Sequence, residues 1–100
     1  MYEFKETKQA LKDWQKIQSM PKSTKERWKE ILKDILNSPR DKEAIGNPEE
    51  LKYNEKELWS RELTKKDRIV YGIEPGANYD MPEEPEFVVF YQYLGHYEDK

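Results

Sequence analysis

The chain has 100 residues, the size of one domain, and we expect a single domain over residues 1–100. It contains no cysteine and one histidine, which excludes disulfides, cysteine nucleophiles and cysteine-based zinc sites. The net charge is −3, and with neither a signal-peptide start nor an apolar run of roughly 20 residues we expect a cytoplasmic protein without a membrane partner.

The first part of the chain predicts a short strand followed by a helix. Residues 2–4 alternate apolar and polar side chains, which favours a strand, and Thr7 is a good helix N-cap. The apolar stripe of this first helix consists of Leu11, Trp14 and Ile17. Pro21 ends the helix, because proline disfavours a helical residue before it. We expect Trp14 to be a core residue.

A second helix is predicted by a stronger amphipathic pattern. Ser23 or Thr24 is expected to cap it, and Pro39 follows its end. Its apolar residues recur at helical spacing and are Trp28, Ile31, Leu32, Ile35 and Leu36. The two helices therefore predict an antiparallel hairpin with a short turn, with Trp28 in the core.

The second part of the chain predicts a loop and then consecutive strands. Residues 37–50 are polar and contain glycine and proline, as is typical of a loop. Strands are predicted at 58–63, 68–73 and 87–94, with Trp59 as a core residue. Helices followed by strands predict an α+β fold, in which an N-terminal helical hairpin packs on one face of a small antiparallel β-sheet.

Two further segments shape the expected surface. The residues at 64–67 predict a turn between two strands, and the segment at about 74–86 is an acidic insertion too rich in proline for a strand interior. Residues 1–73 hold 17 Lys and Arg against 14 Asp and Glu, a balance of +3, whereas residues 74–100 hold 1 against 7, a balance of −6. The body of the domain is therefore mildly basic, which permits contact with phosphate.

Four short motifs occur in order along the chain. They are Gly-Asn-Pro-Glu-Glu-Leu-Lys-Tyr at 46–53, Trp-Ser-Arg at 59–61, Arg-Ile-Val-Tyr at 68–71 and His-Tyr at 96–97. Together with the preceding helical pair, this pattern resembles the YoeB/Txe branch of the RelE/ParE toxin superfamily. One motif alone is a weak signal, but four in register are specific. The resemblance implies the RelE-like fold and a toxin of a type II toxin–antitoxin system.

The resemblance also implies an activity and a set of catalytic residues. Members of the family are ribosome-dependent mRNA endonucleases that cut the message in the decoding site. Glu49 matches the general base, His96 the general acid and Arg68 the arginine that stabilises the phosphate. Lys52 matches a supporting basic residue, and Tyr97 matches an aromatic residue that helps to position the site. No metal and no other cofactor is implied.

Elementary chemistry agrees with such a set. The 2′-hydroxyl of RNA can attack the neighbouring phosphorus when a base removes its proton and an acid protonates the leaving 5′-oxygen. Cations aimed at the phosphate oxygens stabilise the charge that develops there, and the planar fork of arginine matches a phosphate. No metal ion takes part in these steps.

Contacts with RNA are assigned to four further residues. Tyr53, like Tyr97, is a candidate for stacking on an unpaired base, and the basic candidates are Arg61, Lys65 and Lys66. For Arg61 the alternative is a cross-strand ion pair with Glu57 or Glu62. For the two lysines the alternative is a solvated turn.

The expected partners follow from the resemblance. They are the ribosome with its mRNA, and an antitoxin encoded beside the toxin, YefM/Phd-like or of another kind. Operator DNA is expected only through the antitoxin, and homodimers occur among relatives. Two alternatives lack nuclease chemistry: a ParE-like inhibitor of DNA gyrase, and a binding module that stays with its antitoxin as a co-repressor.

Overall fold

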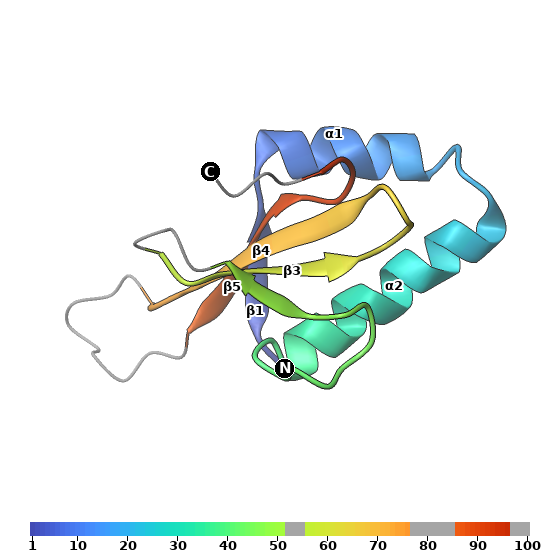
Figure 1. Cartoon of the computed structure of the whole chain (residues 1–100). Helices are drawn as coiled ribbons and strands as arrows, with labels where there is room; N and C mark the ends of the chain where they lie inside the picture. The colour runs from blue at the N-terminus through green and yellow to red at the C-terminus, as the bar shows by residue number, and fades with distance from the viewer. Residues whose placement is uncertain (52–55, 77–85, 97–100) are drawn as a thin grey trace.

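The computed structural model describes residues 1–51, 56–76 and 86–96, which form two helices and a five-stranded sheet (Figure 1). The elements in chain order are β1 (Glu3–Glu6), α1 (Lys8–Ile17), α2 (Lys22–Asn37), β2 (Glu49–Leu51), β3 (Leu58–Glu62), β4 (Arg68–Glu74) and β5 (Phe87–Gln92). The strand order is β1-β5-β4-β3-β2. The predicted α+β class is confirmed.

Helix α1 begins as predicted but buries a different face. The Thr7 hydroxyl accepts a hydrogen bond from the amide of Ala10 at 3.1 Å, which confirms the cap. The side chains that face the sheet are Ala10, Asp13 and Ile17. Leu11 and Trp14 are 47% and 41% exposed, so the predicted stripe is wrong at these two residues, and with it the core position of Trp14. The third residue of the stripe, Ile17, is buried as predicted.

The reason for this error is a buried carboxylate. The Oδ2 atom of Asp13 accepts hydrogen bonds from the backbone amides of Tyr93 at 3.0 Å and Leu94 at 3.2 Å. Gln9 donates to the other carboxylate oxygen at 2.9 Å. A charged side chain is buried only when it is well hydrogen-bonded, and hydrophobic periodicity does not reveal such a position.

Helix α2 shows the predicted apolar face and a different start. Its buried residues are Trp28, Ile31, Ile35 and Leu36. The N-cap is Pro21, without a side-chain cap bond, so the predicted caps Ser23 and Thr24 are wrong; both residues lie inside the first turn. The carbonyl of Pro21 accepts from the amides of Thr24 and Lys25, which begins the helix one residue after the proline.

The sheet contains the four predicted strands, β1, β3, β4 and β5, and one more. Strands β3, β4 and β5 pair antiparallel, as predicted. Strand β2 begins at the end of the segment expected to be a loop, and it pairs antiparallel with β3. Strand β1 pairs parallel with β5, so the sheet is mixed and not purely antiparallel. This last pairing joins the two ends of the chain, which no local pattern indicates.

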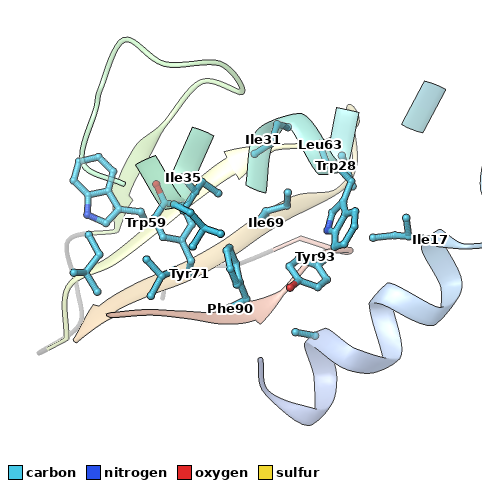
Figure 2. Close-up of a cluster of buried hydrophobic side chains, with 14 residues drawn as sticks. Ile17, Trp28, Ile31, Ile35, Trp59, Leu63, Ile69, Tyr71, Phe90 and Tyr93 are labelled. Atoms are coloured by element: carbon cyan, nitrogen blue, oxygen red, sulfur yellow. The ribbon is translucent and has the colours of Figure 1, made fainter. Parts of the chain in front are cut away.

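One face of the sheet forms the hydrophobic core with the helices (Figure 2). Side chains of α1 and α2 meet the inward-facing residues of three strands, among them Trp59, Ile69, Tyr71 and Phe90. Trp28 packs edge-to-face on Tyr93, with ring centroids 5.3 Å apart. The core positions predicted for Trp28 and Trp59 are therefore confirmed.

The opposite face of the sheet carries a second, smaller apolar cluster. It consists of Leu51, Leu58 and Val70, with Tyr91 packed against them. Alternation along each strand produces these two faces. Neither helix in the described part of the chain is long and apolar enough to cross a membrane.

The buried carboxylate of Asp13 generates a stability prediction. Asp13→Ala leaves two backbone amides without their acceptor, and we expect it to lower the free energy of unfolding by about 2–4 kcal/mol. Urea denaturation followed by tryptophan fluorescence measures this loss. The control is Lys12→Ala on the exposed face of the same helix, which should change stability by no more than about 0.5 kcal/mol. Equal effects of the two substitutions would contradict the anchoring role of Asp13.

Candidate active site

Three polar side chains from adjacent strands meet on the sheet face opposite the helices. Glu49 of β2 is the register partner of Ser60 on β3, so their side chains lie on the same face. Arg68 of β4 pairs with Glu62, two residues beyond Ser60, and shares that face too. The topology therefore brings together two of the predicted catalytic residues, Glu49 and Arg68.

The guanidinium of Arg68 makes two short hydrogen bonds and two longer contacts. Its Nε and Nη2 atoms donate to the hydroxyl of Ser60 at 3.0 Å and 2.9 Å. The same Nη2 lies 3.5 Å from Oε2 of Glu49 and 3.5 Å from the carbonyl of Asn47. The Arg68 side chain is 24% exposed and that of Glu49 is 67% exposed. The guanidinium of Arg68 is thus held by the buried hydroxyl of Ser60, while the carboxylate of Glu49 remains accessible to solvent.

Neither Ser60 nor Asn47 was predicted as a site residue. A signal for Ser60 existed in the alternation of β3, because Trp59 and Arg61 point into the core and a small polar residue stands between them. For Asn47, the contact is made by the backbone carbonyl, and side-chain identity gives no signal for such a contact.

The chain reaches His96 beside the start of β4. The amide of Arg68 donates to the carbonyl of Gly95 at 2.9 Å, and the amide of Gly95 donates to Oδ1 of Asp67 at 2.9 Å. The Gln92 amide group donates to the carbonyls of Arg68, Leu94 and Gly95. Gly95 has a φ of +91°, which favours glycine. His96 follows directly and is exposed.

The loop before Glu49 packs closely against β3. The carbonyl of Gly46 accepts from the amide of Glu62 at 2.6 Å. A Cβ atom at Gly46, whose φ is +84°, would lie 3.2 Å from both the Cβ of Arg61 and the carbonyl oxygen of Glu62. Asn47 also has a positive φ, of 47°. Glycine is therefore required for the close approach that delivers Glu49 to the site.

Arg61 lies inside the protein and not in the site. Its side chain is fully buried and forms an ion pair with Asp34 of α2. It also donates to the carbonyls of Ser38 at 3.0 Å and Ile45 at 3.4 Å, and to the hydroxyl of Tyr71 at 3.3 Å. A side chain without exposed area makes no contact with RNA, so the predicted RNA-binding role is wrong. The alternative pairing with Glu57 or Glu62 is also wrong.

The remaining predicted residues divide into two groups. Lys65 and Lys66 are exposed in the predicted turn between β3 and β4, next to Arg68. Lys52, Tyr53 and Tyr97 lie outside the described residues, as does most of the acidic insertion. Across the residues that the structure describes, no group of three or more His, Asp or Glu side chains is arranged to hold a metal ion.

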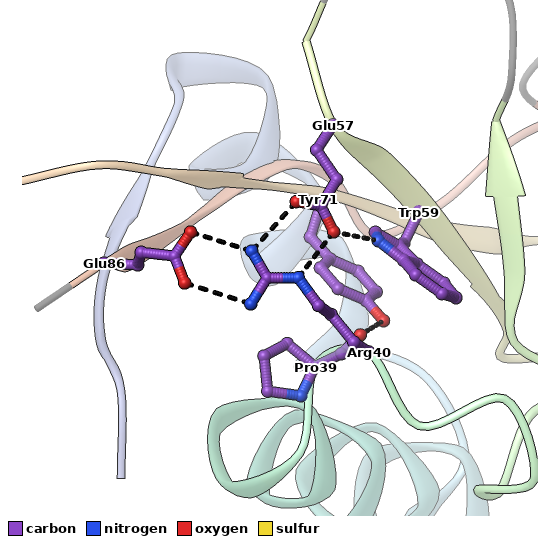
Figure 3. Close-up of polar contacts among 6 residues, drawn as sticks. All are labelled: Pro39, Arg40, Glu57, Trp59, Tyr71 and Glu86. Atoms are coloured by element: carbon purple, nitrogen blue, oxygen red, sulfur yellow. Dashed lines mark hydrogen bonds and ion pairs between the residues drawn. The ribbon is translucent and has the colours of Figure 1, made fainter.

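A second charged cluster joins the loop after α2 to the far ends of β3 and β5 (Figure 3). Arg40 binds Glu57 through two hydrogen bonds of 2.7 Å and 2.9 Å, and Glu86 through two of 3.0 Å and 2.7 Å. Hydrogen bonds from Arg40 lower the pKa of both carboxyl groups, and the indole of Trp59 adds to the effect on Glu57. The two carboxylates in turn raise the pKa of Arg40.

Sequence comparison finds relatives among bacterial toxins. A family model described as the YoeB-like toxin of bacterial type II toxin-antitoxin system matches residues 6–81. Over 44 residues the chain is 43% identical to Toxin YoeB of Escherichia coli O6:H1 and 41% identical to Toxin YoeB of Escherichia coli K12. Each match covers 44% of this chain and 50% of the relative, so the chain spans about half the length of the curated relatives it matches.

Solved structures with the same fold cover almost the whole chain. A YoeB/ParE toxin from Agrobacterium tumefaciens has a TM-score of 0.76 at 22% identity, covering 95% of this chain and 99% of that one; at this identity the likeness shows the fold alone. The YoeB dimer from Staphylococcus aureus has a TM-score of 0.74 at 25% identity, with coverage of 96% and 98%. The heterotetrameric YoeB-YefM complex from that organism gives 0.70 at 25% identity, with coverage of 97% and 99%.

The Arg40 cluster generates a pH prediction. Because the folded-state pKa of Glu57 and Glu86 lies below the unfolded value of about 4.3, the cluster stabilises the fold above that pH and loses this contribution as the pH falls further. Arg40→Met should therefore lower the free energy of unfolding by about 1 kcal/mol at neutral pH, since the cluster is partly exposed.

The difference between wild type and Arg40→Met should shrink as the pH falls below the ordinary pKa of glutamate. Urea titrations at neutral and acid pH measure it. Lys42→Met, an exposed lysine of the same loop, is the matched control and should show no such trend. A difference that stays constant down to acid pH would mean that Arg40 acts by packing alone.

Proposed function

The chain belongs to the family of YoeB-like toxins of bacterial type II toxin–antitoxin systems, and on that basis we propose that it is an endoribonuclease that cuts mRNA in the decoding site of the ribosome. Cleavage of the message there inhibits translation. The observation that supports this proposal is the meeting of Glu49 and Arg68 on one sheet face, with Nη2 of Arg68 3.5 Å from Oε2 of Glu49. Gly95, the residue before His96, accepts a hydrogen bond from the amide of Arg68 at the same end of β4.

The proposed reaction divides its steps among three residues. Glu49 removes the proton of a 2′-hydroxyl, and the oxygen attacks the neighbouring phosphorus. The bond to the 5′-oxygen breaks, and His96 donates a proton to that leaving oxygen. The products are a 2′,3′-cyclic phosphate and a 5′-hydroxyl. Arg68 stabilises the negative charge that grows on the phosphate oxygens during this exchange.

The geometry of Arg68 suits this role. Charge-assisted hydrogen bonds between guanidinium and carboxylate are usually about 2.7–2.9 Å long. The contact with Glu49 is 3.5 Å, so it is a weak ion pair between partly exposed groups. A phosphate can approach Arg68 without breaking a strong internal pair, and Glu49 keeps an accessible carboxylate for proton transfer.

Five further residues are proposed to contact the RNA or to support the site. Lys52 and Tyr97 are proposed to assist the phosphate and to position the site, and Tyr53 is proposed to stack on a base. Lys65 and Lys66 are exposed beside Arg68 and are proposed to contact the RNA backbone. The reaction uses protein side chains and the RNA hydroxyl, and it is proposed to be independent of metal.

The proposed partners follow from relatives of known structure. One Staphylococcus aureus relative is described as a YoeB dimer and others as YoeB-YefM toxin-antitoxin complexes. We therefore propose that this chain binds a YefM-like antitoxin, contacts operator DNA only through that antitoxin, and forms a homodimer. The ribosome and its mRNA are the proposed cytoplasmic target.

The test is cell-free translation with the purified protein, with the ends of the mRNA mapped by primer extension. Loss of a general acid or base typically lowers a rate about 10²–10⁴-fold, and we expect losses in this range for Glu49→Gln and for His96→Ala. Both variants should leave the thermal unfolding midpoint nearly unchanged, because both side chains are exposed.

Glu50→Gln provides the matched control for the base. Glu50 is exposed in the same strand, and successive side chains of a strand point to opposite faces, so its substitution should leave cleavage intact. Intact mRNA and normal translation with the wild-type protein would contradict the nuclease proposal. That result would favour a non-nucleolytic binding module, and a gyrase supercoiling assay would follow.

A further inference from the structure

Ser60 is a buried polar residue in the middle of a sheet face that also carries an apolar cluster. Its side chain lies on β3, the strand between β2 and β4, and is 1% exposed. Its register partners are Glu49 on one side and Val70 on the other. The same sheet face carries the apolar cluster of Leu51, Leu58 and Val70. An apolar side chain at position 60 would extend that cluster, and a buried hydroxyl is tolerated only because it is hydrogen-bonded.

The hydrogen bonds of Ser60 go to one residue of the proposed active site. Its hydroxyl oxygen accepts from Nε of Arg68 at 3.0 Å and from Nη2 at 2.9 Å. Among the described residues, the other contacts of this guanidinium are the two of 3.5 Å to Glu49 and Asn47. Ser60 therefore supplies the short hydrogen bonds that fix the orientation of Arg68. Without them, a long side chain with many rotamers would be held only weakly.

The edge of the guanidinium that Ser60 binds determines which N–H groups of Arg68 are left for a phosphate. Nε and one hydrogen of Nη2 lie on one edge of the planar group, and Nη1 with the second hydrogen of Nη2 form another. Ser60 occupies the first edge, and within the described part of the chain the second makes only the two contacts of 3.5 Å from Nη2 to Glu49 and Asn47. A phosphate that replaces these long contacts can bind the second edge through two of its oxygens. The Arg68 side chain is 24% exposed, so part of it is accessible to a ligand.

We infer that Ser60 is a positioning residue that sets the orientation of Arg68 for the phosphate of the RNA substrate. This inference rests on the proposed nuclease function, and it assigns to Ser60 a role exerted through Arg68 and not through direct contact with RNA. A preorganised cation contributes more to transition-state stabilisation than a mobile one, because no reorganisation is needed during the reaction.

A double-mutant cycle on the full chain tests this inference. Single-turnover cleavage of ribosome-bound mRNA is measured for wild type, Ser60→Ala, Arg68→Ala and the double variant. Misplacing a catalytic group by about 1 Å can cost about 100-fold, and we expect Ser60→Ala to lower the rate about 10- to 100-fold. In the Arg68→Ala background the same substitution should change the rate less than about twofold, because Ser60 then has nothing to position.

Ser23→Ala on the exposed surface of α2 is the control for removal of a serine hydroxyl and should leave cleavage unchanged. A rate loss of equal size in both Arg68 backgrounds would show a general structural role for Ser60 and overturn the inference. Full activity of Ser60→Ala beside an inactive Arg68→Ala would overturn it as well.

A second measurement separates this inference from the proposed function. The chain has four arginines, and ¹H–¹⁵N spectra report the exchange of each Nε–H group with water. We expect the Arg68 signal, identified by its loss in Arg68→Ala, to exchange faster in Ser60→Ala. The Arg40 signal, whose Nε is bonded to Glu57, is the internal reference and should not change.

The two measurements fail in different ways. If the wild-type protein does not cut mRNA but Arg68 exchange rises in Ser60→Ala, the nuclease proposal fails and the positioning of Arg68 by Ser60 is supported. If the Arg68 exchange is unchanged in Ser60→Ala, the inference is overturned whether or not the wild-type protein is a nuclease.

Discussion

The buried guanidinium of Arg61 is the interaction on which the arrangement of the protein depends. A charge in the interior is tolerated only when partners replace the water it has lost. Arg61 finds them in Asp34 of α2, in the carbonyls of Ser38 and Ile45, and in the hydroxyl of Tyr71. One side chain thus joins a helix, two strands and the loop that follows the helix. Because that loop leads to Glu49, the position of a proposed catalytic residue is set by a contact in the core.

The triplet at 59–61 shows how one strand serves both faces of the sheet. Trp59 and Arg61 point toward the helices, where the indole fills the core and the guanidinium binds the loop. Ser60 points to the opposite face and holds Arg68. Strand alternation makes this division obligatory, since a shift of one residue in register would exchange the faces. Residues 59–61 therefore contribute both to the packing of the core and to the proposed site.

The sequence predicted the parts of the fold that depend on local patterns. The apolar spacing of α2 and the β-branched and aromatic runs of β4 and β5 are local signals, and these elements were found where expected. The parallel pairing of β1 with β5 and the burial of Asp13 depend on contacts between residues about 80 positions apart, which periodicity does not report. Trp14 was misplaced for this reason, because the face of α1 is chosen by a hydrogen-bonded carboxylate.

In the candidate site too, the sequence indicated some residues, while others depend on contacts made only in the fold. Glu49, Arg68 and His96 were identified by resemblance, and the structure brings the first two into contact and the third to the neighbouring strand end. Arg61 was assigned to RNA because its residue type suits phosphate, and burial shows that residue type alone does not decide the role of an arginine. Ser60 was missed because its proposed role depends on Arg68, which lies diagonally from it on the neighbouring strand β4.

The described acidic residues of the C-terminal part of the chain, Glu74 and Glu86, lie far from the proposed site. Arg68 and Glu74 are at the two ends of β4, which at about 3.3 Å per residue are about 20 Å apart. The screening length at physiological salt is about 8 Å, so the charge of Glu74 has little effect on a phosphate at Arg68. Glu86, which closes the acidic insertion, is also at that far end, since its neighbour Phe87 is the register partner of Glu74. The charge of Glu86 is compensated by Arg40. The charged residues of the β3–β4 turn, which are nearer to Arg68 along the chain, include Lys65 and Lys66. Glu74 and Glu86 therefore contribute little to the electrostatic field at Arg68, where the described cations of the site and the adjoining turn are nearer.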